Sequence, residues 1–184
     1  FISYPRSSSQ KLPLTINYGK ILKALATLPQ YTKFCEELLA KEKLIPNEGP
    51  KEDPAHPAVY ATHEVPDLKK LTPQQKKLYD LIVRRTLATF ADEAMRESVN
   101  VILAINGNKF IAVGKRTIEL GWTKIYSPYL AFEEQILPEL KIGQILKVIK
   151  IDLLAKETQP PGRYSQGSII KEMENRNLGT RATR

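Results

Sequence analysis

A tyrosine and an arginine lie two positions apart near the start of the chain, in the stretch FISYPRSSSQ. A free tyrosine has a pKa of about 10, so only about one phenol in a thousand is ionised at neutral pH. A nearby cation favours the phenolate, and a guanidinium can also bind two phosphate oxygens at once. Tyr4 and Arg6 are therefore a candidate nucleophile for attack at phosphorus and its activating cation, although most tyrosines in such a pattern serve packing.

The chain offers little for thiol or metal chemistry. Cys35 is the only cysteine, which excludes an internal disulfide and a thiolate-rich zinc site. His56 and His63 are the only histidines, and no Asp-x-Asp pair occurs. We therefore expect no metal ligands in this sequence. Taken alone, His56 between two prolines is better explained as the cap of a turn than as a functional residue.

The net charge of +8 is unevenly distributed along the chain. Residues 1–35 hold five basic residues and no acid, and residues 141–184 hold nine basic residues against four acidic ones. The stretch between them is nearly balanced. Two cationic ends would attract a polyanion such as DNA, because each Lys or Arg that meets a phosphate releases condensed counterions. The alternative is a basic surface that serves solubility.

Composition indicates a globular chain. It has 184 residues, of which 42% are apolar and 26% charged. No apolar run is long enough to cross a membrane, and no secretory leader is visible. We therefore expect a cytoplasmic protein without a membrane partner. Because the sequence starts at Phe1, inside an expected strand, we also expect a fragment of something longer.

The first half of the sequence predicts helices. Apolar spacing indicates helices at about 18–27 and 31–41, whereas the proline-rich residues 45–70 indicate an irregular crossing segment. Residues 73–91 carry the clearest signal, because Thr72 and Gln75 form a capping box around Pro73. We expect Leu78, Leu81, Ile82 and Phe90 on the buried face of this helix. Arg84 and Arg85 are expected to form salt bridges rather than to contact DNA.

The second half predicts strands. Apolar residues alternate in SVNVILAI, Asn106-Gly107 indicates a hairpin turn, and KFIAVGKRTIEL returns as the partner strand. The stretches GWTKIY and GQILKVIKIDLLAKE are expected to add further strands. A last helix is expected in SQGSIIKEMENRNLG, with Gly179 as its C-terminal cap.

Five segments, taken in order, resemble the type IA DNA topoisomerases, particularly the archaeal topoisomerase I branch. The matching segments are ISYPRSSSQKLP, HPAVYATHEVP, LYDLIVRRTLATFADEA, the β segment that ends in GWTKIY, and PPGRYSQGSIIKEMENRNLGTRATR. Together they cover most of the chain. The same motif order occurs in the topoisomerase half of reverse gyrase, which stays open as an alternative.

The resemblance implies a set of site residues. Tyr4 stands where the family has the nucleophile that becomes linked to a 5′ phosphate, and Arg6 matches the arginine that positions this phosphate. His56 matches a family histidine near the active site, where a hydrogen bond to DNA phosphate is implied. Single-stranded DNA is the implied partner, and the implied contacts come from basic residues towards both ends, namely Lys11, Arg163, Lys171 and Arg181.

The resemblance also implies a mixed α+β multidomain fragment. Residues 1–96 would form part of the helical domain that bears the tyrosine, residues 97–160 the second half of a β-rich arch, and residues 161–184 the start of the next helical DNA-binding domain. The family's acidic Toprim domain, which would bind Mg²⁺, has no counterpart in the sequence. We therefore expect this chain alone to be inactive and to need the remaining domains of the same enzyme.

Two departures and one rival stay open. Ser7 and Ser8 follow Arg6 where many relatives have Thr and Asp, and the end of the chain reads GTRAT where many bacterial relatives read GRPST. The rival from another class is a non-catalytic single-stranded DNA-binding module, in which Tyr4 would be structural.

Overall fold

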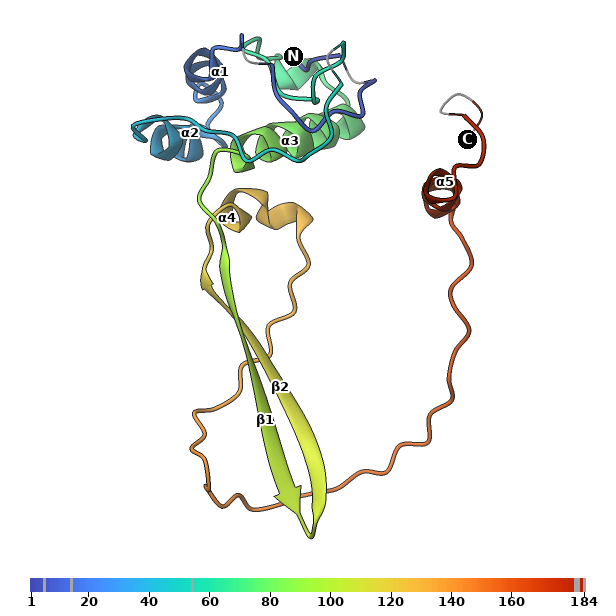
Figure 1. Ribbon diagram of the computed structural model, residues 1–184. Helices are drawn as coiled ribbons and strands as arrows, with labels where there is room; N and C mark the ends of the chain where they lie inside the picture. The colour runs from blue at the N-terminus through green and yellow to red at the C-terminus, as the bar shows by residue number, and fades with distance from the viewer. Residues whose placement is uncertain (5, 14, 54, 181–182, 184) are drawn as a thin grey trace. The chain divides into compact units, whose positions relative to one another are not determined.

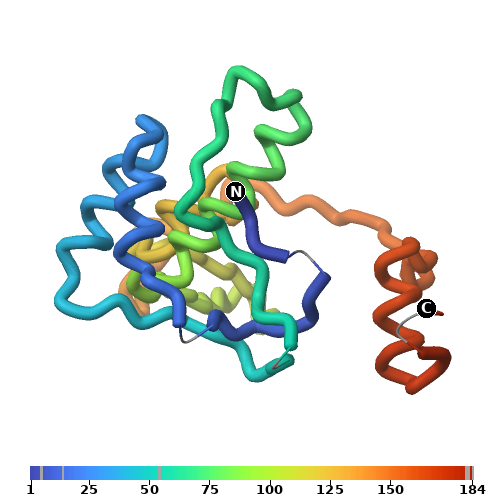
Figure 2. Tube along the Cα trace, turned by 90° about the horizontal axis from the view of Figure 1, so that it is seen from above, coloured from blue at the N-terminus to red at the C-terminus, as the bar shows by residue number. Residues whose placement is uncertain are grey.

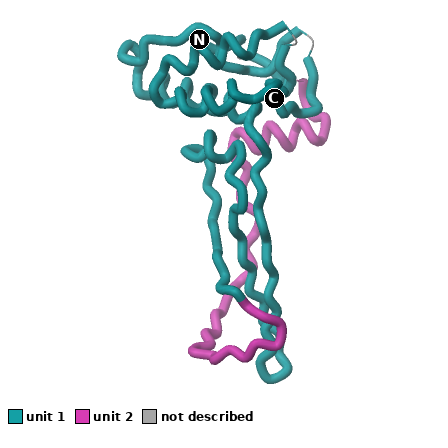
Figure 3. Tube along the Cα trace, turned by 90° about the vertical axis from the view of Figure 1, so that its left-hand side faces the viewer, with its two compact units in different colours: residues 1–139 teal, residues 140–184 magenta. Residues whose placement is uncertain are grey.

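The computed structural model describes residues 1–4, 6–13, 15–53, 55–180 and 183. Two compact units are present, Phe1–Glu139 and Leu140–Arg184, which Figure 3 colours separately. Helices and a two-stranded antiparallel sheet occur together, so the predicted mixed α and β character is confirmed. In these ranges no helix is both long and apolar enough to span a bilayer. The boundaries proposed near residues 96 and 160 stay predictions.

Two short helices begin the core of the first unit. They are α1 (Tyr18–Leu25) and α2 (Thr32–Leu39), close to the ranges expected from apolar spacing. The side chain of Asn17 accepts a hydrogen bond from the Lys20 N–H at 2.9 Å and so caps α1. Leu22, Leu25 and Cys35 are almost fully buried where these helices meet. Burial raises the pKa of the Cys35 thiol to about 12, as expected for an inert packing residue.

The long helix α3 (Pro73–Ala88) follows the irregular segment, which contains one short helix, η1 (Leu68–Lys70). The predicted capping box is confirmed, because Thr72 and Gln75 exchange both hydrogen bonds. Of the predicted buried face, Phe90 is buried and Leu81 and Ile82 are partly buried, but the predicted burial of Leu78 is wrong, since this side chain is 55% exposed. Tyr79, Val83 and Leu87 are buried instead. Apolar residues occur on more than one side of α3, so only contacts with the rest of the core select the buried face.

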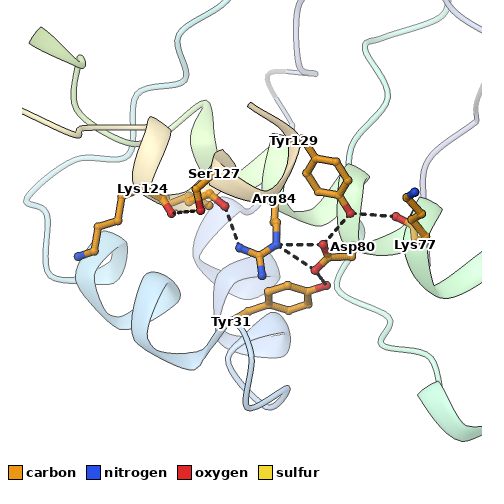
Figure 4. Close-up of polar contacts among 8 residues, drawn as sticks. Tyr31, Lys77, Asp80, Arg84, Lys124, Ser127 and Tyr129 are labelled. Atoms are coloured by element: carbon orange, nitrogen blue, oxygen red, sulfur yellow. Dashed lines mark hydrogen bonds and ion pairs between the residues drawn. The ribbon is translucent and has the colours of Figure 1, made fainter. Parts of the chain in front are cut away.

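A carboxylate on α3 connects three elements of the first unit (Figure 4). Asp80 accepts hydrogen bonds from the hydroxyls of Tyr31 and Tyr129, both at 2.7 Å. Arg84 Nε donates to both oxygens of the same carboxylate at 3.0 Å, and its Nη1 donates to the Ile125 carbonyl at 2.9 Å. The predicted salt bridge of Arg84 is therefore confirmed. Arg85 instead lies over the Tyr126 ring, 5.6 Å from its centroid.

The hairpin consists of β1 (Met95–Ile105) and β2 (Asn108–Glu119) (Figure 1). Its register places Val101 opposite Ala112 and Ile105 opposite Asn108. Asn106 and Gly107 have φ angles of 47° and 79°, so both central turn positions are left-handed, as the sequence predicts. Gln135 forms a bridge to Lys115 beside β2.

The prediction of a strand in GWTKIY is wrong. Residues 123–126 form a short helix, α4 (Thr123–Tyr126), followed by η2 (Ser127–Tyr129). Gly121 takes a φ of +46°, and the Trp122 N–H donates to the Asp92 carbonyl at 2.8 Å. These contacts, with Ile125 buried in the core, turn the chain back towards α3. Local alternation over six residues is too weak to override such tertiary contacts.

The second unit corrects two further expectations. The segment at 143–157 forms no strand, and its apolar side chains stay exposed, with Ile145 at 95% and Leu153 at 99%. A strand needs a hydrogen-bonding neighbour, which alternation cannot supply. Helix α5 (Gln166–Asn175) confirms the last predicted helix. Its left-handed cap is Asn177, not Gly179, because the Leu178 N–H bonds back to the Met173 carbonyl at 2.8 Å.

Candidate active site

The segment that carries Tyr4 is held by the chain near residue 60. Ile2 forms a bridge with Ala61, the Ser3 N–H donates to the Tyr60 carbonyl at 2.9 Å, and the Tyr60 N–H donates to Ser3 Oγ at 3.0 Å. The Ala61 N–H in turn donates to Thr86 Oγ1 on α3 at 3.0 Å. Figure 2 shows the two segments side by side, with the N-terminus next to the crossing segment. The backbone before Tyr4 is therefore fixed to the helical core.

Tyr4 and His56 are neighbours in space. Tyr4 is 59% exposed, and the centroid of its ring lies 5.6 Å from that of the His56 imidazole, with 32° between the planes. The structure thus brings together two of the three residues that the sequence predicted to be catalytic. The phenol remains open to solvent, so an extended substrate could approach it without any movement of this segment.

His56 is held through its imidazole and through its backbone. Its Nδ1 lies 3.3 Å from Asp53 Oδ2, while Asp53 Oδ1 accepts the Ala55 N–H at 3.1 Å. The backbone of His56 is held as well, because Ser7 Oγ donates to the His56 carbonyl at 2.5 Å. Desolvation would raise the pKa of Asp53, but the hydrogen bonds from Ala55 and His56 outweigh it and hold this pKa below its usual value.

The two cations nearest to Tyr4 in sequence differ in their surroundings. Arg6 is exposed, and its guanidinium makes no hydrogen bond or ion pair with the described residues. Lys11 pairs with Glu52 at 3.4 Å, and its carbonyl accepts the Ala58 N–H at 2.8 Å. The backbone at residue 11 is therefore fixed to the same crossing segment that carries His56. As far as the described residues go, the Arg6 guanidinium therefore keeps its donors available for an anion.

The remaining candidate contacts belong to the second unit. Arg163 precedes α5, Lys171 lies on this helix, and both are exposed. Ser165 caps α5 through a capping box with Ser168. Arg181 lies outside the described residues. The proposed DNA contacts of these three residues stay predictions.

The described ranges contain no cluster of side chains that could bind a divalent cation. No group of three or more His, Cys, Asp or Glu side chains lies close enough there to hold a metal ion. His56 and Asp53 form an isolated pair, and one imidazole with one carboxylate falls short of the ligand sets typical of protein metal sites.

An open cleft of about 810 Å³ lies elsewhere on the first unit, lined among others by Gln10, Tyr60, Arg85 and Trp122. Neither Tyr4 nor His56 lines it. Trp122 borders this cleft and packs against Tyr126, with ring centroids 6.2 Å apart. We assign this cleft no role in the chemistry, because neither Tyr4 nor His56 is among its lining residues.

Sequence reasoning missed the residues that hold the site. Asp53 and Ser3 were not singled out, although Asp53 stands three residues before His56 in the stretch DPAH, and Ser7 was noted only as a departure from the family pattern. The side chain of an Asp often accepts a hydrogen bond from the backbone N–H two residues further along and so caps a turn. The stretch DPAH is therefore a usable signal. The contacts of Ser3 and Ser7 join distant segments, and no local pattern predicts them.

Comparison with known proteins gives a consistent result. A family model described as DNA topoisomerase matches residues 1–184. The chain is 50% identical over 184 residues to DNA topoisomerase 1 of Pyrococcus horikoshii, covering 100% of this chain and 27% of that protein. It is 52% identical to DNA topoisomerase 1 of Methanocaldococcus jannaschii, covering 100% of this chain and 24% of that protein. It is 27% identical over 183 residues to human DNA topoisomerase 3-alpha, covering 18% of that protein. The chain thus spans about a quarter of the length of its archaeal relatives.

Proposed function

Because the chain belongs to the type IA DNA topoisomerase family, we propose that Tyr4 is the nucleophile that opens one DNA strand and becomes linked to the 5′ phosphate at the break. One observation supports this assignment above the others: an exposed phenol lies beside an imidazole on two segments that are hydrogen-bonded to each other. A nucleophile with an adjacent titratable group is the usual arrangement for covalent catalysis.

The proposed reaction is a transesterification. The Tyr4 oxygen forms a bond to phosphorus as the bond to the 3′ oxygen breaks. The phenol loses its proton, and the leaving 3′ oxygen gains one. In the reverse step the 3′ hydroxyl attacks the phosphotyrosine and restores the strand. One ester replaces another in each direction, so no ATP is required.

Two side chains of this sequence would assist. Arg6 would bind the non-bridging phosphate oxygens and offset the charge that develops there. His56 would form a hydrogen bond to the same phosphate or exchange a proton at the reacting oxygens, since its ring lies next to that of Tyr4.

Mg²⁺ enters the proposal only through a Toprim domain that lies outside this sequence. The described residues do not supply a ligand set for it, so no step above depends on the metal. When bound, such an ion would stabilise phosphate charge. We propose that the complete enzyme relaxes supercoiled DNA and that the 184-residue chain alone does not.

The proposed substrate is single-stranded DNA. The basic ends of the sequence support binding to a polyanion, and Lys11, Arg163, Lys171 and Arg181 are the proposed phosphate contacts. The logarithm of the affinity should fall with that of the salt concentration, with a slope of about −0.7 per phosphate neutralised. Tighter binding to blunt duplex at the same salt would contradict this preference.

The decisive experiment traps the covalent adduct. The complete protein that carries this sequence is incubated with a labelled single strand and denatured, and the protein-linked DNA is quantified. Tyr4→Phe should abolish the adduct, because it removes only the attacking oxygen. Tyr164→Phe is a matched control, because the two tyrosines are similarly exposed, Tyr4 at 59% and Tyr164 at 60%. This control variant should leave the adduct unchanged. An adduct that survives in Tyr4→Phe would overturn the assignment, and binding without any adduct in the wild type would favour a non-catalytic module.

A second experiment tests the arginine. Arg6→Ala in the complete protein should slow strand cleavage by roughly 10- to 1000-fold, the range expected for the loss of a charge-assisted contact to the reacting phosphate. Arg6→Lys should restore only part of the rate, because lysine keeps the charge without the bidentate fork. Cleavage at the wild-type rate in Arg6→Ala would remove this residue from the mechanism.

A further inference from the structure

Asp53 has two separate contacts with the turn that carries His56. Its Oδ1 accepts the Ala55 N–H at 3.1 Å and so caps the turn, which is also closed by the His56 N–H to the Asp53 carbonyl at 3.2 Å. Its Oδ2 lies 3.3 Å from His56 Nδ1. The first contact is sufficient to shape the backbone. The second concerns only the imidazole.

The second contact restricts the protonation pattern of the ring. A carboxylate only accepts hydrogen bonds, so it favours a proton on the nitrogen that faces it. Neutral His56 would therefore carry its proton on Nδ1 and present Nε2 as an acceptor. The charged ring would carry protons on both nitrogens. In either state the nitrogen that exchanges its proton is Nε2, because Asp53 keeps Nδ1 protonated.

We propose that Asp53 is a positioning residue for the strand-cleavage reaction, acting through His56 by holding Nδ1 protonated and leaving Nε2 to serve the site beside Tyr4. This inference rests on the proposed function, because it gives Asp53 a role only if the reaction occurs at Tyr4. Ser7 supports the same arrangement by donating to the His56 carbonyl. The ring is thus held through its backbone and through one nitrogen.

The chain contains a natural comparison for a purely structural role. Asp67 accepts the Lys69 N–H at 3.0 Å, and its own carbonyl accepts the Lys70 N–H at 3.0 Å, which repeats the turn at Asp53. The residue three positions on is Lys70, whose Nζ lies 4.0 Å from Asp67 Oδ2. Asp67 therefore has the same backbone cap and an ion pair, but no imidazole and no neighbouring Tyr4.

Asp53→Asn separates the cap from the contact with the ring. Asparagine retains an oxygen that can accept the Ala55 N–H, so the turn is preserved. Its amide nitrogen replaces the second oxygen and turns an acceptor into a donor. Neutral His56 should then place its proton on Nε2, the opposite tautomer.

The tautomer can be read from nitrogen-15 NMR of the complete protein labelled at histidine, in which the His56 signals are assigned by their loss in His56→Gln and the His63 signals by their loss in His63→Gln. We expect the Nδ1–H form for neutral His56 in the wild type and the Nε2–H form in Asp53→Asn, with His63 unchanged. The Nε2–H form in the wild type would overturn the proposal. This measurement does not require catalysis, so it is independent of whether Tyr4 is the nucleophile.

The functional arm uses adduct formation by the complete protein. Asp53→Asn should slow it by about 10- to 100-fold, by analogy with the carboxylates that orient metal-bound histidines. Asp67→Asn should leave the rate unchanged, and Asp53→Glu should recover part of it, because the carboxylate returns without the ideal cap. A wild-type rate in Asp53→Asn, with the adduct still lost in Tyr4→Phe, would reject the role of Asp53 and keep the proposed function. An adduct that survives in Tyr4→Phe would reject the proposed function itself.

Discussion

The helical region and the β1–β2 hairpin are built from similar apolar residue types, yet their side chains have opposite environments. Leu25, Val83 and Leu87 in the helices are fully buried. On the hairpin, Ile102 is 65% exposed and Ile111 is 72% exposed. Burial requires a second layer, and the helices supply one another with it. The hairpin is covered only in part: Gln135 bridges to Lys115 and the Arg96 guanidinium lies 4.3 Å from the centroid of the Phe132 ring, while Ile102 and Ile111 stay exposed.

The difference shows where folding free energy resides. In the helices it comes from removal of apolar surface from water, at about 25 cal/mol per Å². The hairpin depends on its turn and its ladder of hydrogen bonds, and a two-stranded ribbon is only marginally stable by itself. We therefore expect the hairpin to open locally at a lower free energy than the helices.

The largest expected effect on the free energy of unfolding comes from a cavity in the core of the helical region. Leu87→Ala should lower the free energy of unfolding by about 2–5 kcal/mol, because it leaves a cavity at a fully buried site. Ile111→Ala on the hairpin should change it by about 0.5 kcal/mol or less. Urea unfolding followed by circular dichroism measures both. Equal losses would show that the hairpin has a core of its own.

The next effect concerns the carboxylate that ties α4 and η2 to α3. Asp80→Ala removes the acceptor that the Tyr31 hydroxyl, the Tyr129 hydroxyl and Arg84 Nε share. The Tyr129 hydroxyl keeps the Lys77 carbonyl at 3.2 Å, and Arg84 Nη1 keeps the Ile125 carbonyl. Removing one partner of a buried pair costs about 3–5 kcal/mol, and we expect about 2–3 kcal/mol because the Asp80 side chain is 27% exposed. The variant Asp80→Ala/Arg84→Ala should lose less than the two single losses combined, as measured by urea unfolding. Additive losses would mean that the two side chains act independently.

A smaller effect targets the hairpin turn. Gly107→Ala should destabilise the hairpin by about 1–2 kcal/mol, because the φ of +79° is unfavourable for a residue with a side chain. Nothing lies within 4 Å of the added methyl group, so steric contact does not contribute. Amide hydrogen exchange should accelerate in β1 and β2 and stay unchanged in α1 and α3. Faster exchange in the helices as well would show that the two regions open together.

The last effect is a loss of stability in the helical region that depends on its buried tyrosines. It appears only at alkaline pH and is absent at neutral pH. Burial raises the pKa of Tyr79 to about 12, and burial with the hydrogen bond to Asp80 raises that of Tyr129 to about 12. A pKa that is higher in the folded state means that the neutral phenol is favoured there. The associated stability is complete below about pH 10 and is lost as the pH rises towards 12.

Absorbance at 295 nm and circular dichroism, followed together from pH 9 to pH 13, should show late phenol ionisation coupled to loss of helix. Tyr129→Phe should remove part of the late ionisation. Ionisation of every tyrosine near pH 10 with the helices intact would contradict the burial of these phenols.

The candidate site could be predicted only in part. Tyr4, Arg6 and His56 were identified through resemblance, because Tyr-x-Arg alone is too common to indicate catalysis. The pairing of Tyr4 with His56 depends on the bridge between Ile2 and Ala61, two short segments far apart in sequence. The sequence indicates a short strand at Phe1 but no partner for it, so the register of the two segments was not predictable. The role of Asp53 depends on the direction of one carboxylate oxygen, which composition and spacing do not encode.

The sequence by itself determined the elements whose signals are local. The capping box at Thr72 and Gln75 and the Asn106-Gly107 turn act through neighbouring backbone groups, and both are present as expected. Tertiary structure decided which face of α3 is buried, made GWTKIY a helix and left residues 143–157 without a strand. Each of these outcomes depends on a partner distant in sequence, because a helix face needs a surface to pack against and a strand needs a neighbour for its hydrogen bonds.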